Sequence, residues 1–155
     1  MSTKIKRNNE WKTVANTETS IPLPDGPIEI RVLDTNRVKQ YVCSAYRKGN
    51  VVQVDCPVSQ FNFPADAGGE YFLFFIPGVE PVLDGSAITI DYDSRVLRNV
   101  CAYITLARHY PALQEQYGIG NGTLIRCWIN SSYEMPAPFD TPFNIGGTFI
   151  CKDVN

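Results

Sequence analysis

Apolar and polar residues alternate along much of the chain after residue 27. Ile28, Ile30 and Val32 alternate with Glu29 and Arg31, which is the pattern of a β-strand with one face in water. The same criteria predict further extended runs over 41–46, 51–56, 61–64, 71–76, 88–92, 99–108, 123–130 and 147–152. Short strands separated by proline and glycine, with at most one short helix, predict an all-β chain, either an antiparallel β-sandwich or a jelly roll.

Some segments refine this prediction. Residues 47–50, Arg-Lys-Gly-Asn, connect two extended runs and predict a β-hairpin. Residues 71–76 are continuously apolar and aromatic, as in a strand covered on both faces. A helix is predicted over 111–117, which begins with proline and is followed by glycine. Residues 94–109 fit either a helix or a strand, and we favour a strand over 99–108 because β-branched and aromatic residues are dense there.

The first twenty residues differ from the rest of the chain. They are polar and offer only Ile5, Trp11 and Val14 as apolar anchors, which is too little for a core. Such an arm is either disordered or ordered against a neighbouring subunit, with Trp11 as its anchor. Three prolines follow and interrupt any helix or ladder. The predicted organisation is an N-terminal arm over 1–20, a Pro-rich hinge over 21–27 and a single β-domain over 28–155.

Composition and charge exclude several classes of protein. Hydrophobic residues make up 44% of the chain and charged residues 19%, which is too apolar for a disordered protein. The longest apolar run is too short to cross a bilayer, and no apolar stretch follows the basic N-terminal residues as in a secretory signal. The net charge is −2 and the pI is near 5.4. We therefore expect no membrane and no nucleic acid among its partners.

The side chains that bind metals are scattered along the sequence. Five cysteines occur without a CxxC pair, and His109 is the single histidine, so no zinc site is predicted. We expect the cysteines to be reduced and mostly buried as small hydrophobic residues. Asp84, Asp91 and Asp93 lie around one predicted strand and form either a calcium site or a wet strand edge. Further oxygen ligands are not apparent, and we predict no metal and no cofactor.

The chain carries no catalytic motif. It lacks the phosphate-binding G-x-x-x-x-G-K-[ST], the dinucleotide-binding G-x-G-x-x-G, the nucleophile elbow G-x-S-x-G and the zinc motif H-E-x-x-H. His109 fits a solvent-edge or capping residue, with a Cys–His nucleophilic pair as the alternative. A glycosidase needs two carboxylates at a set spacing, but a chain with sixteen acidic residues would contain such a pair by chance. The acidic residues therefore do not indicate a glycosidase. We therefore predict that the protein is not an enzyme.

Residues 131–146 are rich in proline and glycine and are predicted to form a long loop. Loops of this length commonly bind or contact other molecules. Aromatic residues near turns and loops suit either sugar stacking or subunit contact, namely Tyr103, Tyr110, Tyr117, Tyr133, Phe139 and Phe143. Arm and loop together supply the predicted protein-contact residues, which are Ile5, Trp11, Val14, Tyr133, Phe139 and Phe143.

The segment Lys4-Ile5-Lys6-Arg7-Asn8-Asn9-Glu10-Trp11-Lys12-Thr13-Val14 resembles the K-I-K-x-N-G-x-W-x-x-V heading of tail, fibre and head-decoration proteins of tailed bacteriophages. The resemblance covers residues 4–14 and departs at Asn9, where glycine is common. It implies a virion structural protein, a capsid cement, decoration or tail-associated component made in the host cytoplasm. The implied partners are copies of itself and a capsid or tail protein, and no catalytic residue is transferred.

Two other functions stay open from the sequence. A small-virus or satellite jelly-roll capsid protein has the predicted fold, but coats that package RNA carry a strongly basic arm. Residues 1–20 hold only four basic and two acidic side chains. A carbohydrate-binding β-sandwich module is the second alternative, and it would present clustered exposed aromatic side chains.

Overall fold

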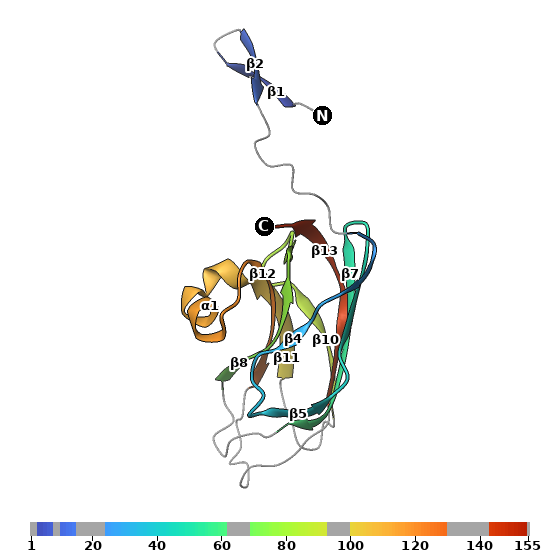
Figure 1. Cartoon of the computed structure of the whole chain (residues 1–155). Helices are drawn as coiled ribbons and strands as arrows, with labels where there is room; N and C mark the ends of the chain where they lie inside the picture. Colours follow the sequence, from blue (N-terminus) through green and yellow to red (C-terminus); the bar gives the residue numbers. More distant parts are fainter. Residues whose placement is uncertain are drawn as a thin grey trace.

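The described part of the chain is mostly antiparallel β-structure, which confirms the all-β class (Figure 1). The structure is a computed structural model and describes residues 3–7, 10–14, 24–61, 69–92, 100–129 and 143–154. The strands are β1 (Thr3–Arg7), β2 (Glu10–Val14), β3 (Gly26–Ile28), β4 (Arg31–Val32), β5 (Val38–Tyr41), β6 (Ser44–Lys48), β7 (Val51–Phe61), β8 (Gly69–Pro77), β9 (Val79–Pro81), β10 (Ala87–Tyr92), β11 (Val100–Leu106), β12 (Gly122–Ile129) and β13 (Phe143–Asp153).

Strands β3 to β13 form one curled sheet, and β1 pairs with β2 in a separate two-stranded sheet. The order in the large sheet is β3-β6-β7-β13-β10-β11-β12-β8-β4. The long strands β7 and β13 each pair with two shorter strands along one edge. β6 and β5 pair with successive parts of β7, and β10 and β9 pair with successive parts of β13.

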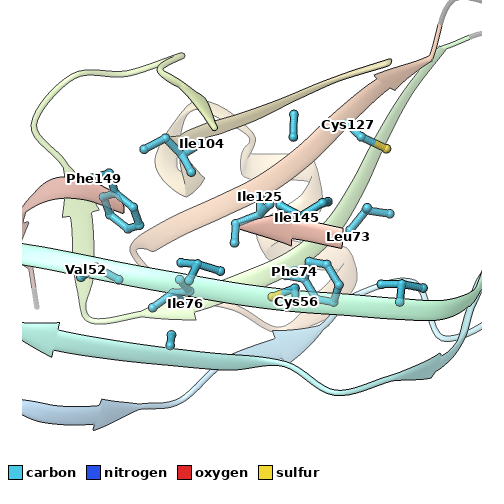
Figure 2. Close-up of a cluster of buried hydrophobic side chains, with 14 of the residues drawn as sticks. Val52, Cys56, Leu73, Phe74, Ile76, Ile104, Ile125, Cys127, Ile145 and Phe149 are labelled. Atoms are coloured by element: carbon cyan, nitrogen blue, oxygen red, sulfur yellow. The ribbon is translucent and has the colours of Figure 1, made fainter. Parts of the chain in front are cut away.

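The hydrophobic core lies inside the curl of the sheet (Figure 2). Alternate residues of β7 point inward and bury Val52, Val54 and Cys56, whereas the residues between them are exposed. Ile104 of β11 and Ile125 of β12 belong to the same buried cluster. The period-two pattern of the sequence thus fills one core from strands that are distant in the chain.

Strand β8 is covered on both faces, as its apolar run predicts. Phe74 and Ile76 are buried in the main core. Phe75 packs on the other side with Leu124, in a smaller cluster that Leu113 joins from the helix. The helices are η1, a 3-10 turn (Ala107–His109), and α1 (Pro111–Tyr117). The predicted helix is confirmed, including its end at Gly118, which takes the left-handed conformation with φ 60°.

Several predicted strands have other bounds. The run predicted over 41–46 is wrong as one strand, because β5 ends at Tyr41 and β6 begins at Ser44, and the run predicted over 51–56 extends to Phe61 in β7. The strand predicted over 28–32 is wrong as one element, because β3 and β4 lie at opposite ends of the sheet order. β3 pairs with β6 and β4 pairs with β8, so the chain crosses between the two halves of the sheet at residues 29–30. The strand predicted over 99–108 ends at Leu106, where the chain turns into η1.

The predicted loop over 131–146 is wrong at its end, because β13 begins at Phe143 and not at Gly147. Phe143 and Ile145 are buried, and the strand continues through the paired glycines. Gly147 has φ 150°, and a Cβ there would lie 3.5 Å from the Cβ of Ile88. The Ile88 contact is an ordinary van der Waals distance, so it is the positive φ that favours glycine at a position that resembles a turn in sequence.

Several strands have no counterpart in the sequence prediction. β9 is three residues long and is held by pairing with the end of β13. β5 was not predicted as a separate strand, and it pairs with the second half of β7. In the arm, β1 pairs antiparallel with β2, with Thr3 opposite Val14 and Arg7 opposite Glu10. Short strands of this kind depend on partners that local sequence does not reveal.

Candidate assembly surface

The β-domain begins beside the turn between β6 and β7. The carboxylate of Asp25 accepts a hydrogen bond from the backbone N–H of Gly49, with an N–O distance of 2.6 Å. Gly26 lies opposite Arg47 in the register of β3 and β6. Gly49 has φ 58°, a left-handed conformation that suits glycine in this turn. The N-terminal arm therefore joins the β-domain at the β6–β7 turn.

A buried ion pair fixes this junction from the inside. The Arg47 guanidinium contacts both carboxylate oxygens of Asp153 at the end of β13, and Nη2 lies 3.2 Å from Oδ2. Its Nε also donates to the carbonyl oxygen of Gly49 at 2.6 Å. The hydrogen bond to Asp153 raises the pKa of Arg47, while burial acts in the opposite direction. β6, β13 and the turn at the base of the arm are thus held together.

A row of exposed apolar side chains starts at the same turn. Val51 of β7 lies opposite Ile150 of β13, and the N–H of Val82 donates to the Ile150 carbonyl at 2.9 Å. The exposed fractions are 38% for Val51, 56% for Ile150 and 62% for Val82, and the next residue, Leu83, is 71% exposed. These four residues are called the apolar row below. Exposed apolar residues that occur singly are ordinary, but adjacent ones across neighbouring strands indicate a contact surface.

The rim of the apolar row is polar. Lys48 lies opposite Val51 in the β6–β7 register, and Lys152 lies two residues beyond Ile150 on the same outward face. Both lysines are exposed. An apolar centre with a charged rim is the usual composition of a protein–protein contact surface.

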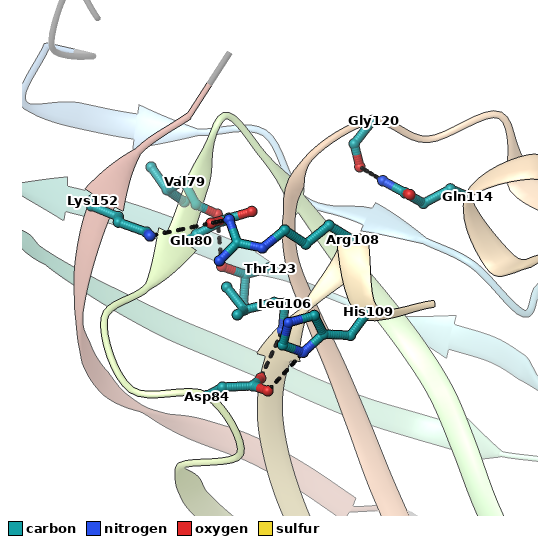
Figure 3. Close-up of polar contacts among 10 residues, drawn as sticks. All are labelled: Val79, Glu80, Asp84, Leu106, Arg108, His109, Gln114, Gly120, Thr123 and Lys152. Carbon is teal, nitrogen blue, oxygen red and sulfur yellow. Dashed lines mark hydrogen bonds and ion pairs between the residues drawn. The ribbon is translucent and has the colours of Figure 1, made fainter. Parts of the chain in front are cut away.

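Beneath this surface, a buried carboxylate joins three elements (Figure 3). Glu80 of β9 has no exposed surface, and its Oε2 lies 2.5 Å from Nη1 of Arg108 in η1 and 3.6 Å from Nζ of Lys152. Its other oxygen, Oε1, is buried without a hydrogen-bond partner. The neighbouring Thr123 hydroxyl donates to the carbonyl of Val79 at 2.8 Å. These contacts fix β9 and hence the position of Val82.

A second polar cluster holds the segment after Leu83 (Figure 3). Asp84 accepts hydrogen bonds from the Thr105 hydroxyl at 2.6 Å and from the Leu106 N–H at 2.9 Å. Its other oxygen lies 2.9 Å from Nδ1 of His109. Burial by itself would raise the pKa of Asp84, but the three hydrogen bonds together hold it below the ordinary value. His109 thus fits the predicted solvent-edge residue, with a carboxylate and not a thiol as its partner at Nδ1.

Another face of the sheet presents aromatic and charged side chains. Trp128 of β12 is about half exposed and lies opposite Cys101 of β11. Next to this pair, the Arg126 guanidinium lies 5.4 Å from the centre of the Tyr103 ring and forms an ion pair with Glu70. Burial lowers the pKa of Arg126, and its Nε is buried without a hydrogen-bond partner. A Trp and an Arg–Tyr stack on one flat face can bind a planar or sugar-like ligand.

The predicted contact residues are only partly placed by the structure. Ile5, Trp11 and Val14 belong to β1 and β2, of which the backbone alone is described. Tyr133 and Phe139 lie outside the described residues. Phe143 is 5% exposed and packs edge-on against Phe61, with ring centres 5.3 Å apart. It belongs to the core because β13 starts four residues earlier than predicted, and the described surface does not offer it to a partner.

Of the remaining aromatic candidates, Tyr103 lies near Trp128, and Tyr110 and Tyr117 lie at α1. Tyr103 is on the face that carries Trp128. Tyr110 packs on Phe72 with ring centres 4.8 Å apart, and Tyr117 joins the same small cluster under α1. Arg126 lies opposite both Tyr103 of β11 and Phe72 of β8, so Tyr103 and Tyr110 lie on the same outer face of the sheet, on either side of Arg126 and Phe72.

The predicted calcium cluster is also only partly described. The side chain of Asp91 and the whole of Asp93 lie outside the described residues, whereas Asp84 is engaged by Thr105, Leu106 and His109. Among the side chains that the structure describes, no three His, Cys, Asp or Glu residues come together to hold a metal ion. No helix in the described part of the chain is long and apolar enough to cross a membrane.

Sequence reasoning missed the apolar row and Trp128. Val51 and Ile150 lie in strands and Val82 follows β9, and only the pairing between these distant segments shows that the three residues are neighbours. A local signal existed at Val82-Leu83, where two apolar residues precede the Asp-Gly turn. Comparison of the chain with protein-family models, with curated proteins and with solved structures found no match.

Proposed function

We propose that this chain is a non-enzymatic virion structural protein that assembles through its N-terminal arm and the apolar row. Its partners would be copies of itself and a capsid or tail protein, as for a cement, decoration or tail-associated component. The observation that carries the proposal is the position of the apolar row, next to the turn where the arm joins the β-domain. Burying such side chains in a contact contributes about 25 cal/mol per Å² of apolar surface.

Charge supports the arm of a second copy as the occupant of this surface. Residues 1–20 carry four basic and two acidic side chains, whereas residues 21–155 carry ten basic and fourteen acidic ones. The arm is therefore positive by two charges and the rest of the chain negative by four. Opposite net charges favour association of the arm with the β-domain of another copy, and the attraction weakens as salt rises.

The length of the chain also permits an exchange of arms. Residues 15–23, which connect β2 to the β-domain, can span at most about 30 Å when extended. In a two-fold dimer each arm would leave its own β6–β7 turn and contact the apolar row of its partner, so that both contacts are identical. The resemblance of residues 4–14 to the heading of phage structural proteins is compatible with an arm that acts in assembly.

Light scattering on the full chain and on a chain without residues 1–20 tests this proposal. We expect the full chain to be a dimer or a larger assembly and the shortened chain to be a folded monomer. The shortened chain retains every strand of the large sheet, because that sheet begins at Gly26. Equal masses for the two chains, both monomeric or both assembled, would contradict the role of the arm.

A carbohydrate-binding function is the second candidate, and Trp128 is the observation that favours it. A half-exposed Trp beside the Tyr103–Arg126 stack provides a stacking platform with hydrogen-bond donors nearby. A glycan array with the full chain would give hits that Trp128→Ala abolishes. Tyr46→Ala is the matched control, because Tyr46 is similarly exposed on β6. An array without hits would remove this candidate.

A further inference from the structure

Two cysteines face each other across neighbouring strands of the sheet. In the register of β5 and β6 with β7, Tyr41 lies opposite Val58 and Ser44 lies opposite Asp55. The same register places Cys43 directly opposite Cys56. The intervening chain keeps this register, because the N–H of Val42 donates to the carbonyl of Pro57 at 3.0 Å.

The type of cross-strand pair favours a short separation. Hydrogen-bonded and non-hydrogen-bonded pairs alternate along an antiparallel ladder. Since residues 42 and 57 form a hydrogen-bonded pair, Cys43 and Cys56 form a non-hydrogen-bonded one. The Cα atoms of such pairs are about 4.5 Å apart, which lies within the range of about 4.4–6.8 Å that a disulfide spans.

The two thiols differ in their environment. Cys56 is fully buried, whereas Cys43 is partly exposed at the edge of the same core cluster. Their side chains are hydrogen-bonded to each other, and this contact, together with burial, raises the pKa of Cys56. A reagent in solution therefore reaches Cys43 first, and Cys56 is placed to react with the sulfur of Cys43 in a second step.

We propose that Cys43 and Cys56 form a thiol pair that closes to a cross-strand disulfide on reaction with a small disulfide such as oxidised glutathione. The Cys43 thiolate attacks one sulfur of oxidised glutathione, forms a mixed disulfide and releases one glutathione thiolate. Cys56 then loses its proton, attacks the Cys43 sulfur and releases the second glutathione. Two protein thiols are oxidised, and one molecule of oxidised glutathione is reduced to two of glutathione.

The other cysteines do not share this arrangement. Cys101 is exposed but lies opposite Trp128. Cys127 lies opposite Ala102 of β11 and Tyr71 of β8. Cys151 lies opposite Pro81. Among the described residues, Cys43 and Cys56 are thus the two cysteines that lie opposite each other on paired strands.

The test treats the full reduced chain with oxidised glutathione and follows its intact mass and its non-reduced peptides. The expected product is two hydrogens lighter than the reduced chain, with Cys43 and Cys56 joined and with dithiothreitol restoring the thiols. We also expect the Tm to rise by about 5–10 °C on closure, since the cross-link restricts the conformations of the unfolded chain. Cys101→Ser should close in the same way, whereas Cys43→Ser should not lose two hydrogens.

Labelling of the thiols in denaturant, on the unchanged chain before and after oxidation, gives the answer even where Cys43→Ser does not fold, because unfolding exposes Cys56 to the reagent. Protection of both Cys43 and Cys56 from an alkylating reagent supports the proposal. If oxidation instead adds glutathione to Cys101, or joins two chains through it, while Cys43 and Cys56 still react with the reagent, the proposal is overturned.

Discussion

Val51 on β7 lies directly opposite Ile150 on β13, and both side chains point away from the core. Their inward neighbours Val52 and Phe149 are buried on the other side of the same two strands. The apolar row and the core therefore lie on opposite faces of one strand pair. A substitution at Ile150 can change assembly without changing the packing of the core.

Ile150→Lys is expected to reduce the assembled mass of the full chain to that of a monomer. The lysine places a charge in the centre of the apolar row, where a contact surface excludes charge. Because residue 150 is exposed, the free energy of unfolding should change by less than about 0.5 kcal/mol. Light scattering and urea denaturation measure the two effects. Asn144→Lys, on the same face of β13, is the control and should leave the mass unchanged.

Arg47→Met is expected to lower the free energy of unfolding by about 3 kcal/mol. It removes the guanidinium that contacts both oxygens of the Asp153 carboxylate at the base of the arm, and breaking one side of a buried ion pair is costly. Arg31→Met is the comparison, because its ion pair with Glu29 is exposed and should contribute less than about 1 kcal/mol. Equal losses in urea denaturation would show that the junction is not held by the ion pair.

Gly122→Ala is expected to destabilise the sheet by about 3 kcal/mol. A Cβ at residue 122 would lie 2.3 Å from the carbonyl oxygen of Ile76 and 2.7 Å from the ring of Phe75, so backbone atoms must move. Gly120→Ala is the matched control two residues earlier, because a Cβ there meets nothing within 4 Å. Thermal unfolding of the two variants should separate them clearly, and equal Tm values would refute the expected clash.

Asp84→Asn is expected to change the dependence of stability on pH. The folded-state pKa of Asp84 is lowered, so its carboxylate stabilises the fold above the unfolded value of about 4 and loses this effect as the pH falls through the folded value. The wild type should therefore have a higher Tm than Asp84→Asn. This difference in Tm should be largest near neutral pH and should decrease below about pH 4. Thr105→Val, which removes one hydrogen bond to Asp84, should show part of this change.

Much of the fold could be predicted because it depends on local patterns. The hairpin at residues 47–50 follows from its turn residues, and the double burial of β8 follows from its continuous apolar run. The helix at 111–117 follows from the proline at its start and Gly118 at its end. In each case the physical cause lies within a few residues of the element.

The parts that could not be predicted depend on contacts between distant segments. Three residues such as Val79–Pro81 become a strand because the end of β13 lies beside them. Gly146 and Gly147 resemble a turn, yet they continue a strand because β7 pairs with both of them and β10 pairs with Gly146. The apolar row has the same origin, since its members come from β7, β13 and the segment after β9. The arm residues Ile5, Trp11 and Val14 stay a prediction for which the assembly experiment is the test.

The place of β13 in the sheet has a consequence for how the chain is made. This strand joins β7 to β10 and β9, although it comes after all of them in the order of synthesis. Until β13 is available, β7 and β10 each expose an unpaired edge, and such edges pair readily with other chains. We therefore expect slow folding that is dominated by late pairing, and a chain ended before Phe143 should aggregate instead of reaching a soluble fold.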